Sequence, residues 1–275
     1  MASTANIMLL DENGVARTYN DVSRIALKNA DDPGETVVFS LDGAGSALLK
    51  SIIDGSVTEL TADDLYGITE FRGQAFALCS NLESIAIPAS VTTIGNGAFQ
   101  YCVALGSVEI PDSVTSFGNR VFYYCSGLTD VTIGNGLTKI FSETFLGCYA
   151  LSSVSIGTGV TEIQSDAFTY CESLESIDIP NNVTAIGTYA FQSCIALASV
   201  TIGTGISSIG ANAFDSCSSL MSLTCKATTP PTIQSTTFSG VPATCAIYVP
   251  AASVNAYKSK QYWSSRAAYI QAIPT

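Results

Sequence analysis

Histidine is absent from the 275 residues of this chain, and charged residues make up only 12 % of it. Without histidine the chain cannot form a Ser-His-Asp triad, a Cys-His dyad or a histidine-ligated metal site from its own residues. Basic residues are also few, 11 against 23 acidic ones, which gives a formal net charge of −12. Because contacts with phosphates need lysine and arginine, this balance argues against a broad nucleic-acid-binding face.

Long apolar runs are missing as well, since no stretch reaches the roughly 18 residues that a membrane-spanning helix needs. The first residues lack the basic and then apolar pattern of a signal peptide, so we expect either no export by that route or a leader outside this sequence. The apolar content of 47 % is nevertheless high enough to bury a substantial core in one or two domains.

Internal repetition with a period of 23 residues is the main feature of the sequence. Three columns keep this step over seven units without an insertion, and they consist of Cys79, Cys102, Cys125, Cys148, Cys171, Cys194 and Cys217, of Phe76, Phe99, Phe122, Phe145, Phe168, Phe191 and Phe214, and of Leu82, Leu105, Leu128, Leu151, Leu174, Leu197 and Leu220. A fixed period between about 20 and 29 residues with an L-x-x-V-x-I core is typical of a leucine-rich-repeat solenoid.

Each unit predicts one strand followed by turns. Ile85 and Ile87 alternate with Ser84 and Ala86, which is the two-residue period of a strand. A proline or a glycine then turns the chain away, at Pro88, Pro111, Gly134, Gly157, Pro180 and Gly203. Residues 98–102 are expected to form a short helical or 3-10 turn before the next strand. One unit has too little apolar surface to fold alone, so stacked neighbours must stabilise it.

The unit V-T-x-I-G-x-x-A-F-x-x-C-x-x-L-x-S-V-x-I-P/G resembles the BspA-like leucine-rich repeats of bacterial surface antigens and adhesins, over residues 68–225. This resemblance implies a non-catalytic module that binds protein or glycan, located outside the cell or at its surface. The missing signal peptide leaves a cytoplasmic or phage-borne location open. Because a fold does not fix a function, a structural spacer or virion-type appendage module projecting from its N-terminal β unit is the alternative.

The ends of the chain depart from the repeat. Hairpin signals at residues 11–14 and 31–35 predict a small β unit or cap over residues 1–47. The solenoid is predicted over 48–228, with a degenerate first coil before the seven regular repeats. Residues 229–275 are predicted to close the solenoid with a strand at 247–249 and a helix from 251 to 260, covering the open end of the core.

The seven cysteines of the repeat predict buried free thiols rather than a disulfide or metal array. Stacked coils would hold their Cβ atoms about 4.8 Å apart, beyond the usual disulfide range, and no C-x-x-C spacing occurs. Cysteine then acts as a small hydrophobe. Cys225 and Cys245 remain open, since Cys245 lies outside the column and a bond between the two is possible.

The exposed strand positions predict a smooth, mildly acidic sheet. Its candidate contacts are Glu109, Asp130 and Asp178, and it carries no Trp, Tyr or Arg of the kind that dominates binding interfaces. Tyrosines gather elsewhere, within two residues of the cysteine column, at Tyr101, Tyr123, Tyr124, Tyr149 and Tyr170. They pack beside the core or form an aromatic strip that contacts a protein or glycan, since tyrosine offers large contact area at low entropic cost.

No set of residues suits catalysis, so we expect no enzyme activity, no cofactor and no metal. Residues 73–225 hold 11 acidic and 2 basic residues, whereas residues 226–275 hold four basic residues and no acidic one. The acidic coils are expected to keep a repetitive protein soluble, as a monomer or with weak self-association.

Overall fold

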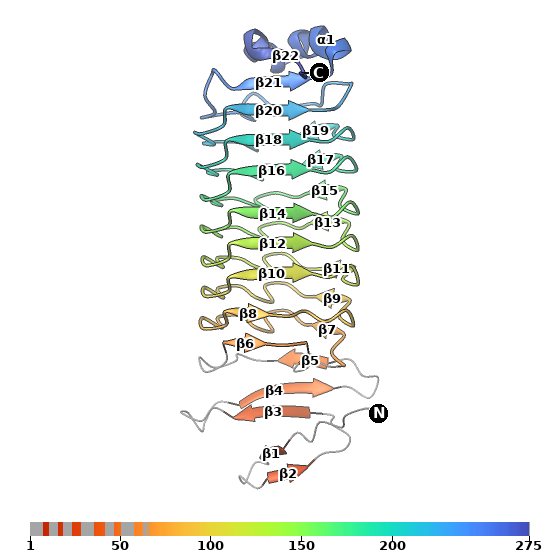
Figure 1. Cartoon of the computed structure of the whole chain (residues 1–275), viewed down its shortest axis with the longest axis vertical. Coiled ribbons are helices and arrows are strands. Elements are labelled where there is room, and N and C mark those ends of the chain that lie inside the picture. Colours follow the sequence, from red (N-terminus) through yellow and green to blue (C-terminus); the bar gives the residue numbers. More distant parts are fainter. Residues whose placement is uncertain are drawn as a thin grey trace.

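The two-residue alternation of each repeat places one strand per coil on the same side of a solenoid (Figure 1). The computed structural model describes strand backbone between residues 8 and 50, and then residues 58–62, 65 and 67–274. Equivalent residues 23 apart pair in parallel register, as Val108 does with Val131. The strands of this side, the strand face, are β6 (Glu59–Leu60), β8 (Ser84–Ile85), β10 (Ser107–Ile110), β12 (Asp130–Ile133), β14 (Ser153–Ile156), β16 (Ser176–Ile179), β18 (Ser199–Ile202), β20 (Ser222–Cys225), β21 (Ala246–Val249) and β22 (Ile270–Ala272).

A second parallel ladder forms where each chain returns its Val-Thr-x-Ile segment to the core. Its two-residue strands are β7 (Glu70–Phe71), β9 (Thr93–Ile94), β11 (Ser116–Phe117), β13 (Lys139–Ile140), β15 (Glu162–Ile163), β17 (Ala185–Ile186) and β19 (Ser208–Ile209). This ladder consists of two sheets, one ending at β11 and the other beginning at β13. In every member the second residue is buried, which fixes the register of the coil.

The third side of each coil is a run of turns in which backbone amides alternate between two kinds of partner. Ala98, Gln100 and Cys102 donate to carbonyls three residues earlier in the same coil. The amides between them, those of Phe99 and Tyr101, donate to Val121 and Tyr123 of the next coil. The predicted turn over residues 98–102 is therefore present, with three-residue bonds as in a 3-10 helix, but its alternation prevents a continuous helix.

Phenylalanine fills the centre of every regular coil. The seven rings of the phenylalanine column are fully buried, and adjacent rings stack nearly parallel with centroids 4.9–5.5 Å apart. Leucine and cysteine of the same coils pack around them in one continuous core. The burial predicted for all three columns is confirmed, and it explains why the period tolerates no insertion.

The cysteine column does more than fill space. The Sγ atom of Cys102 donates to the carbonyl of Phe76, 26 residues earlier, at 3.0 Å, and the five cysteines above it repeat this bond at 3.0–3.3 Å. All nine cysteines are buried and free, including Cys225 and Cys245. The prediction of buried free thiols is confirmed, and the possible bond between the last two is absent from the structure.

Thiol reagents are expected to leave the native protein unmodified. Burial raises the pKa of the Cys217 thiol to about 12 and raises the pKa of Cys148 still further, so at pH 8 almost no thiolate is present to react. Ellman's reagent at pH 8 should find less than one thiol per native chain and all nine after denaturation in guanidinium. Rapid modification of the native protein would show that the coils open or that the thiols are exposed.

The two ends of the chain differ from the coils. At the N-terminal end, β1 (Met8–Leu10) pairs antiparallel with β2 (Ala16–Thr18), and β3 (Arg24–Lys28), β4 (Thr36–Leu41) and β5 (Ala47–Lys50) form an antiparallel sheet. The hairpin turns predicted at 11–14 and 31–35 lie outside the described residues. At the other end, β21 leads into η1 (Ala251–Ser253), α1 (Val254–Ser259) and η2 (Trp263–Tyr269), as the predicted strand and helix required.

Fully buried aromatic side chains close the C-terminal end of the core. Tyr257 donates its hydroxyl to the carbonyl of Ala227, and the indole N–H of Trp263 donates to the carbonyl of Pro231. The Trp263 ring lies 5.5 Å from Phe238, the last ring of the phenylalanine stack. The segment therefore covers the apolar end of the solenoid, which is the role predicted for it.

The strand face has one interruption, between β14 and β16, where the described residues form no ladder (Figure 1). Regular coils join through the amide after the strand, as Gly134 does when it donates to Ile110, and Gly203 to Ile179. Pro180 stands at the same position above Ile156 and has no N–H to donate. The β8–β10 ladder below Pro111 is likewise reduced to one pair, Ser84 with Ser107.

Glycine and proline therefore define two kinds of coil. A Cβ atom on Gly134 or Gly203 would lie 2.5–2.7 Å from backbone atoms of the preceding coil, so only glycine allows this close approach. Proline carries both a Cβ atom and a ring and holds the coils apart. Below the two proline coils Ile87 and Ile156 are only partly buried, whereas the equivalent Ile133 below a glycine coil is buried. We call the interruption between β14 and β16 the seam.

Candidate binding site

The tyrosines singled out in the sequence lie on the outer side of the turn run. Tyr101, Tyr124 and Tyr170 adopt left-handed backbone conformations, with φ between 54° and 61°, a region that few residues other than glycine enter. This conformation turns their side chains outward between the buried Phe and Cys positions. Tyr101 and Tyr170 are each 39 % exposed and Tyr149 is 36 % exposed, while Tyr123 and Tyr124 are half-buried.

Four of the five tyrosines form one continuous chain of ring contacts. Tyr101 stacks on Tyr124 at 5.6 Å, and Tyr123 meets Tyr124 edge to face at 4.6 Å. Tyr149 extends the chain with a centroid 6.0 Å from Tyr124. Tyr170 has no such ring contact among the described residues, because Gly147 occupies the coil position between it and Tyr124. The sequence thus predicted a real aromatic cluster, and its fifth member stands apart.

Charge fixes one side of this cluster. Arg120 forms a two-point salt bridge with Glu143, Nε to Oε2 and Nη2 to Oε1, both at 2.9 Å, and its guanidinium lies 5.5 Å above the ring of Tyr123. Partial burial and the neighbouring Tyr101 raise the pKa of Tyr123. The hydroxyl therefore stays protonated near neutral pH and can donate a hydrogen bond to a ligand. This arginine and glutamate stand 23 residues apart, a spacing that would have identified the pair in the sequence.

The cluster belongs to a longer apolar edge. Nine large hydrophobic side chains of the described residues are exposed. Two of them, Tyr262 and Tyr269, lie in the C-terminal segment, and the other seven lie on or beside the turn run, at Leu78, Tyr101, Val103, Tyr149, Tyr170, Ile195 and Met221. Sequence reasoning missed the four aliphatic members, although Leu78 shares the column of Tyr101, and Val103 and Ile195 share that of Tyr149. We call these seven residues with Tyr123 and Tyr124 the tyrosine edge.

The three acidic candidates of the strand face are not brought together. Glu109 (β10), Asp130 (β12) and Asp178 (β16) are all exposed on separate strands. Asp130 accepts a hydrogen bond from the Thr129 hydroxyl at 2.7 Å. Glu109 and Asp178 line two different shallow hollows. The face is therefore not uniformly smooth, as the sequence had suggested, because the seam opens one of these hollows.

Two further kinds of site were sought in the described part of the chain. It holds no group of three or more Cys, Asp or Glu side chains placed to share a metal ion. Among the same residues no helix is long and apolar enough to cross a membrane.

Comparison with known proteins identifies the repeat. Residues 56–175 and 161–270 match a family model described as BspA type leucine rich repeat region, in six copies. A leucine-rich repeat protein from Bacteroides ovatus ATCC 8483 is 30 % identical over 62 % of this chain and 49 % of its own, with a TM-score of 0.50. The chain thus spans about half the length of that protein.

A second solved structure extends the likeness in fold. A leucine rich cell surface protein from Faecalibacterium prausnitzii A2-165 aligns over 91 % of this chain and 95 % of its own, at 20 % identity and a TM-score of 0.51. Among curated proteins, no sequence matches.

Proposed function

This chain belongs to the BspA type leucine-rich repeat family, and from that premise we propose that it is a non-catalytic binding or adhesion module whose tyrosine edge contacts a protein at a bacterial surface. The observation that carries the proposal is the gathering of exposed apolar residues. All seven large hydrophobic side chains that the described coils expose lie on this one edge. Contiguous exposed apolar surface on a soluble protein commonly marks an interaction site.

The chemistry of the edge indicates what the partner presents. Tyrosine rings supply large, rigid contact area and one hydroxyl each, which suits a polypeptide surface. The surrounding coils are acidic, with 11 acidic and 2 basic residues over 73–225. A partner with apolar side chains flanked by lysine or arginine complements both features, since cations also bind the faces of tyrosine rings.

Changing Tyr123 and Tyr124 to serine is expected to weaken partner binding at least about tenfold, because two central aromatic anchors are lost. Surface plasmon resonance of the purified protein over immobilised extracellular-matrix proteins, mucins and glycans measures the effect. The matched control is the double change of Tyr262 and Tyr269 to serine, which removes two tyrosines of similar exposure away from the edge.

The outcomes separate the alternatives. Saturable binding to a matrix protein that only the edge variant loses supports the proposal, whereas binding to glycans alone would replace the protein partner by a carbohydrate. Binding that both variants retain would remove the tyrosine edge from the interaction. No binding across the panel would overturn adhesion and favour the structural spacer.

A further inference from the structure

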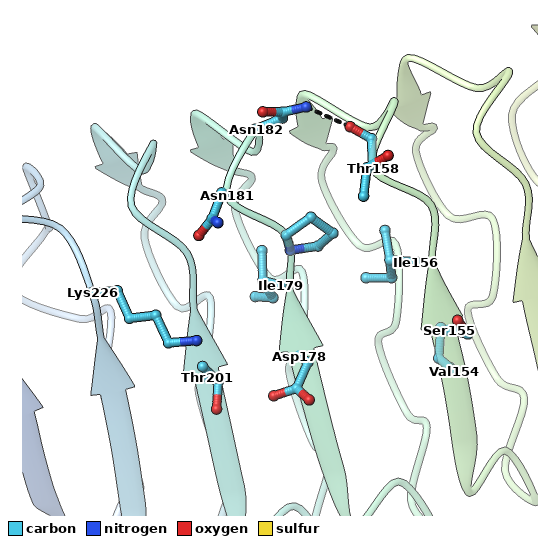
Figure 2. Close-up of a pocket in the computed structure, with 11 residues that line it drawn as sticks. Val154, Ser155, Ile156, Thr158, Asp178, Ile179, Asn181, Asn182, Thr201 and Lys226 are labelled. Carbon is cyan, nitrogen blue, oxygen red and sulfur yellow. Dashed lines mark hydrogen bonds between the residues drawn. The ribbon is translucent and has the colours of Figure 1, made fainter. Parts of the chain in front are cut away.

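The seam between β14 and β16 opens a hollow on the strand face, and its floor is apolar (Figure 2). Val154 and Ile156 of β14 are only partly buried. The equivalent residues of β12, Val131 and Ile133, are 2 % and 3 % exposed. The seam has thus uncovered two core side chains in the middle of the solenoid, where burial is otherwise complete.

Polar groups of several coils surround this floor. Figure 2 shows Asp178 of β16, Thr201 of β18 and Lys226, just beyond β20, around the same hollow. Lys226 forms no ion pair with any described residue. At the rim, the amide of Asn182 donates across the seam to the carbonyl of Thr158 at 2.6 Å. The hollow therefore offers hydroxyl, amide, carboxylate and ammonium groups together.

The main chain adds further groups. Among the described residues β14 and β16 share no ladder hydrogen bond, so the facing amides of β16 and carbonyls of β14 are not occupied by each other. Polar main-chain groups that are left without a partner at a surface form hydrogen bonds with water or with a ligand. A ligand rich in donors and acceptors can therefore replace water along this seam.

We propose that the hollow binds one sugar ring of a neutral glycan. The ring's C–H face would lie on Val154 and Ile156, and its hydroxyls, each both donor and acceptor, would bond Asp178, Thr201 and Lys226. The charges of Asp178 and Lys226 cancel, so a charged ligand gains little over a neutral one. The hollow is open at the surface, which leaves room for the adjoining sugars. Because it lacks an aromatic platform, we expect affinity in the millimolar range.

Saturation-transfer NMR with free glucose, galactose, mannose and N-acetylglucosamine as probes tests the site. At least one sugar should bind the wild-type protein, and Asp178→Ala should weaken that binding by about tenfold or more, through loss of a charged hydrogen-bond acceptor. Glu109→Ala is the matched control, because Glu109 occupies the equivalent strand position in β10, whose ladder with β12 is intact. This variant should bind as the wild type does.

A second variant closes the site without removing a charge. Pro180→Gly combined with Asn182→Gly gives this coil the Gly-x-Gly segment of residues 134–136 and 203–205. We expect β14 and β16 to pair, slower amide exchange over residues 176–179, and loss of sugar binding. This decides the matter if Asp178→Ala fails to fold, which circular dichroism shows.

Three results would overturn the proposal: no probe binds the wild type, Asp178→Ala binds normally, or the closed variant retains binding. The hollow does not depend on the tyrosine edge. Sugar binding that survives replacement of Tyr123 and Tyr124 would separate the two sites.

Discussion

Replacing Phe168 with alanine is expected to lower the free energy of unfolding by about 3–5 kcal/mol, the usual cost of removing a large buried aromatic ring. The ring is fully buried and stacks between Phe145 and Phe191, at centroid distances of 5.2 and 5.1 Å. Because coils of a solenoid are stabilised mainly by their neighbours, one substitution weakens two interfaces at once. Urea unfolding followed by circular dichroism measures the loss.

Phe168→Leu is the matched control, because it retains most of the apolar volume and should cost about 1 kcal/mol. The alanine variant should also unfold over a broader range of urea, since the two halves of the solenoid become less coupled. If alanine and leucine destabilised the protein equally, the stacking of rings would not be the source of the stability.

Gly136→Ala is expected to destabilise the protein by about 2–3 kcal/mol through steric overlap in a packed region. A Cβ atom there would lie 2.1 Å from the carbonyl oxygen of Asp112 and 2.6 Å from that of Val114, both main-chain atoms of the preceding coil. Main chain held in a ladder cannot move aside as a flexible side chain does. The coils must therefore separate, and the β10–β12 ladder should weaken with them.

Gly106→Ala provides the comparison for this prediction. A Cβ atom at Gly106 would meet only the carbonyl oxygen of Glu83, at an ordinary 3.8 Å. Reduced freedom of the unfolded chain should then leave stability unchanged or raise it by up to about 1 kcal/mol. Thermal unfolding of both variants gives the contrast, and a larger loss at Gly106 than at Gly136 would contradict the close approach of the coils.

Most of the fold could be predicted because each apolar column has a single physical cause. Phe168, Cys171 and Leu174 recur every 23 residues since every coil must present the same groups to its neighbours. The hydrogen bond from each cysteine to a phenylalanine carbonyl could not be predicted, because it depends on how two coils are offset rather than on spacing along the chain. The boundaries at 47/48 and 228/229 stay predictions.

The seam shows where reasoning from columns stops. Pro180 and Gly157 occupy one column, and both were interpreted as residues that turn the chain out of a strand. Their difference concerns the coil below, where glycine donates an N–H and allows close approach while proline does neither. A column that is equivalent within a coil is thus not equivalent between coils.

The tyrosine edge was partly predictable for a related reason. Tyr101 and Tyr124 share a column, so their contact followed from the period, whereas Tyr123 and Tyr149 joined the chain through side-chain directions that spacing does not give. Leu78 and Ile195 were overlooked because an aliphatic residue beside a core column reads as core.

The alternating amide bonds of the turn run bear on how the solenoid carries mechanical load. Bonds between coils, such as those from Phe145 to Ala167 and from Gly147 to Thr169, point along the stacking axis and continue without a break beside the seam. A pull along that axis is shared by three sides in most coils but by fewer between β14 and β16. The coils should first part at this position, with the turn run acting as the hinge, so a tethered solenoid would bend there before it unravels.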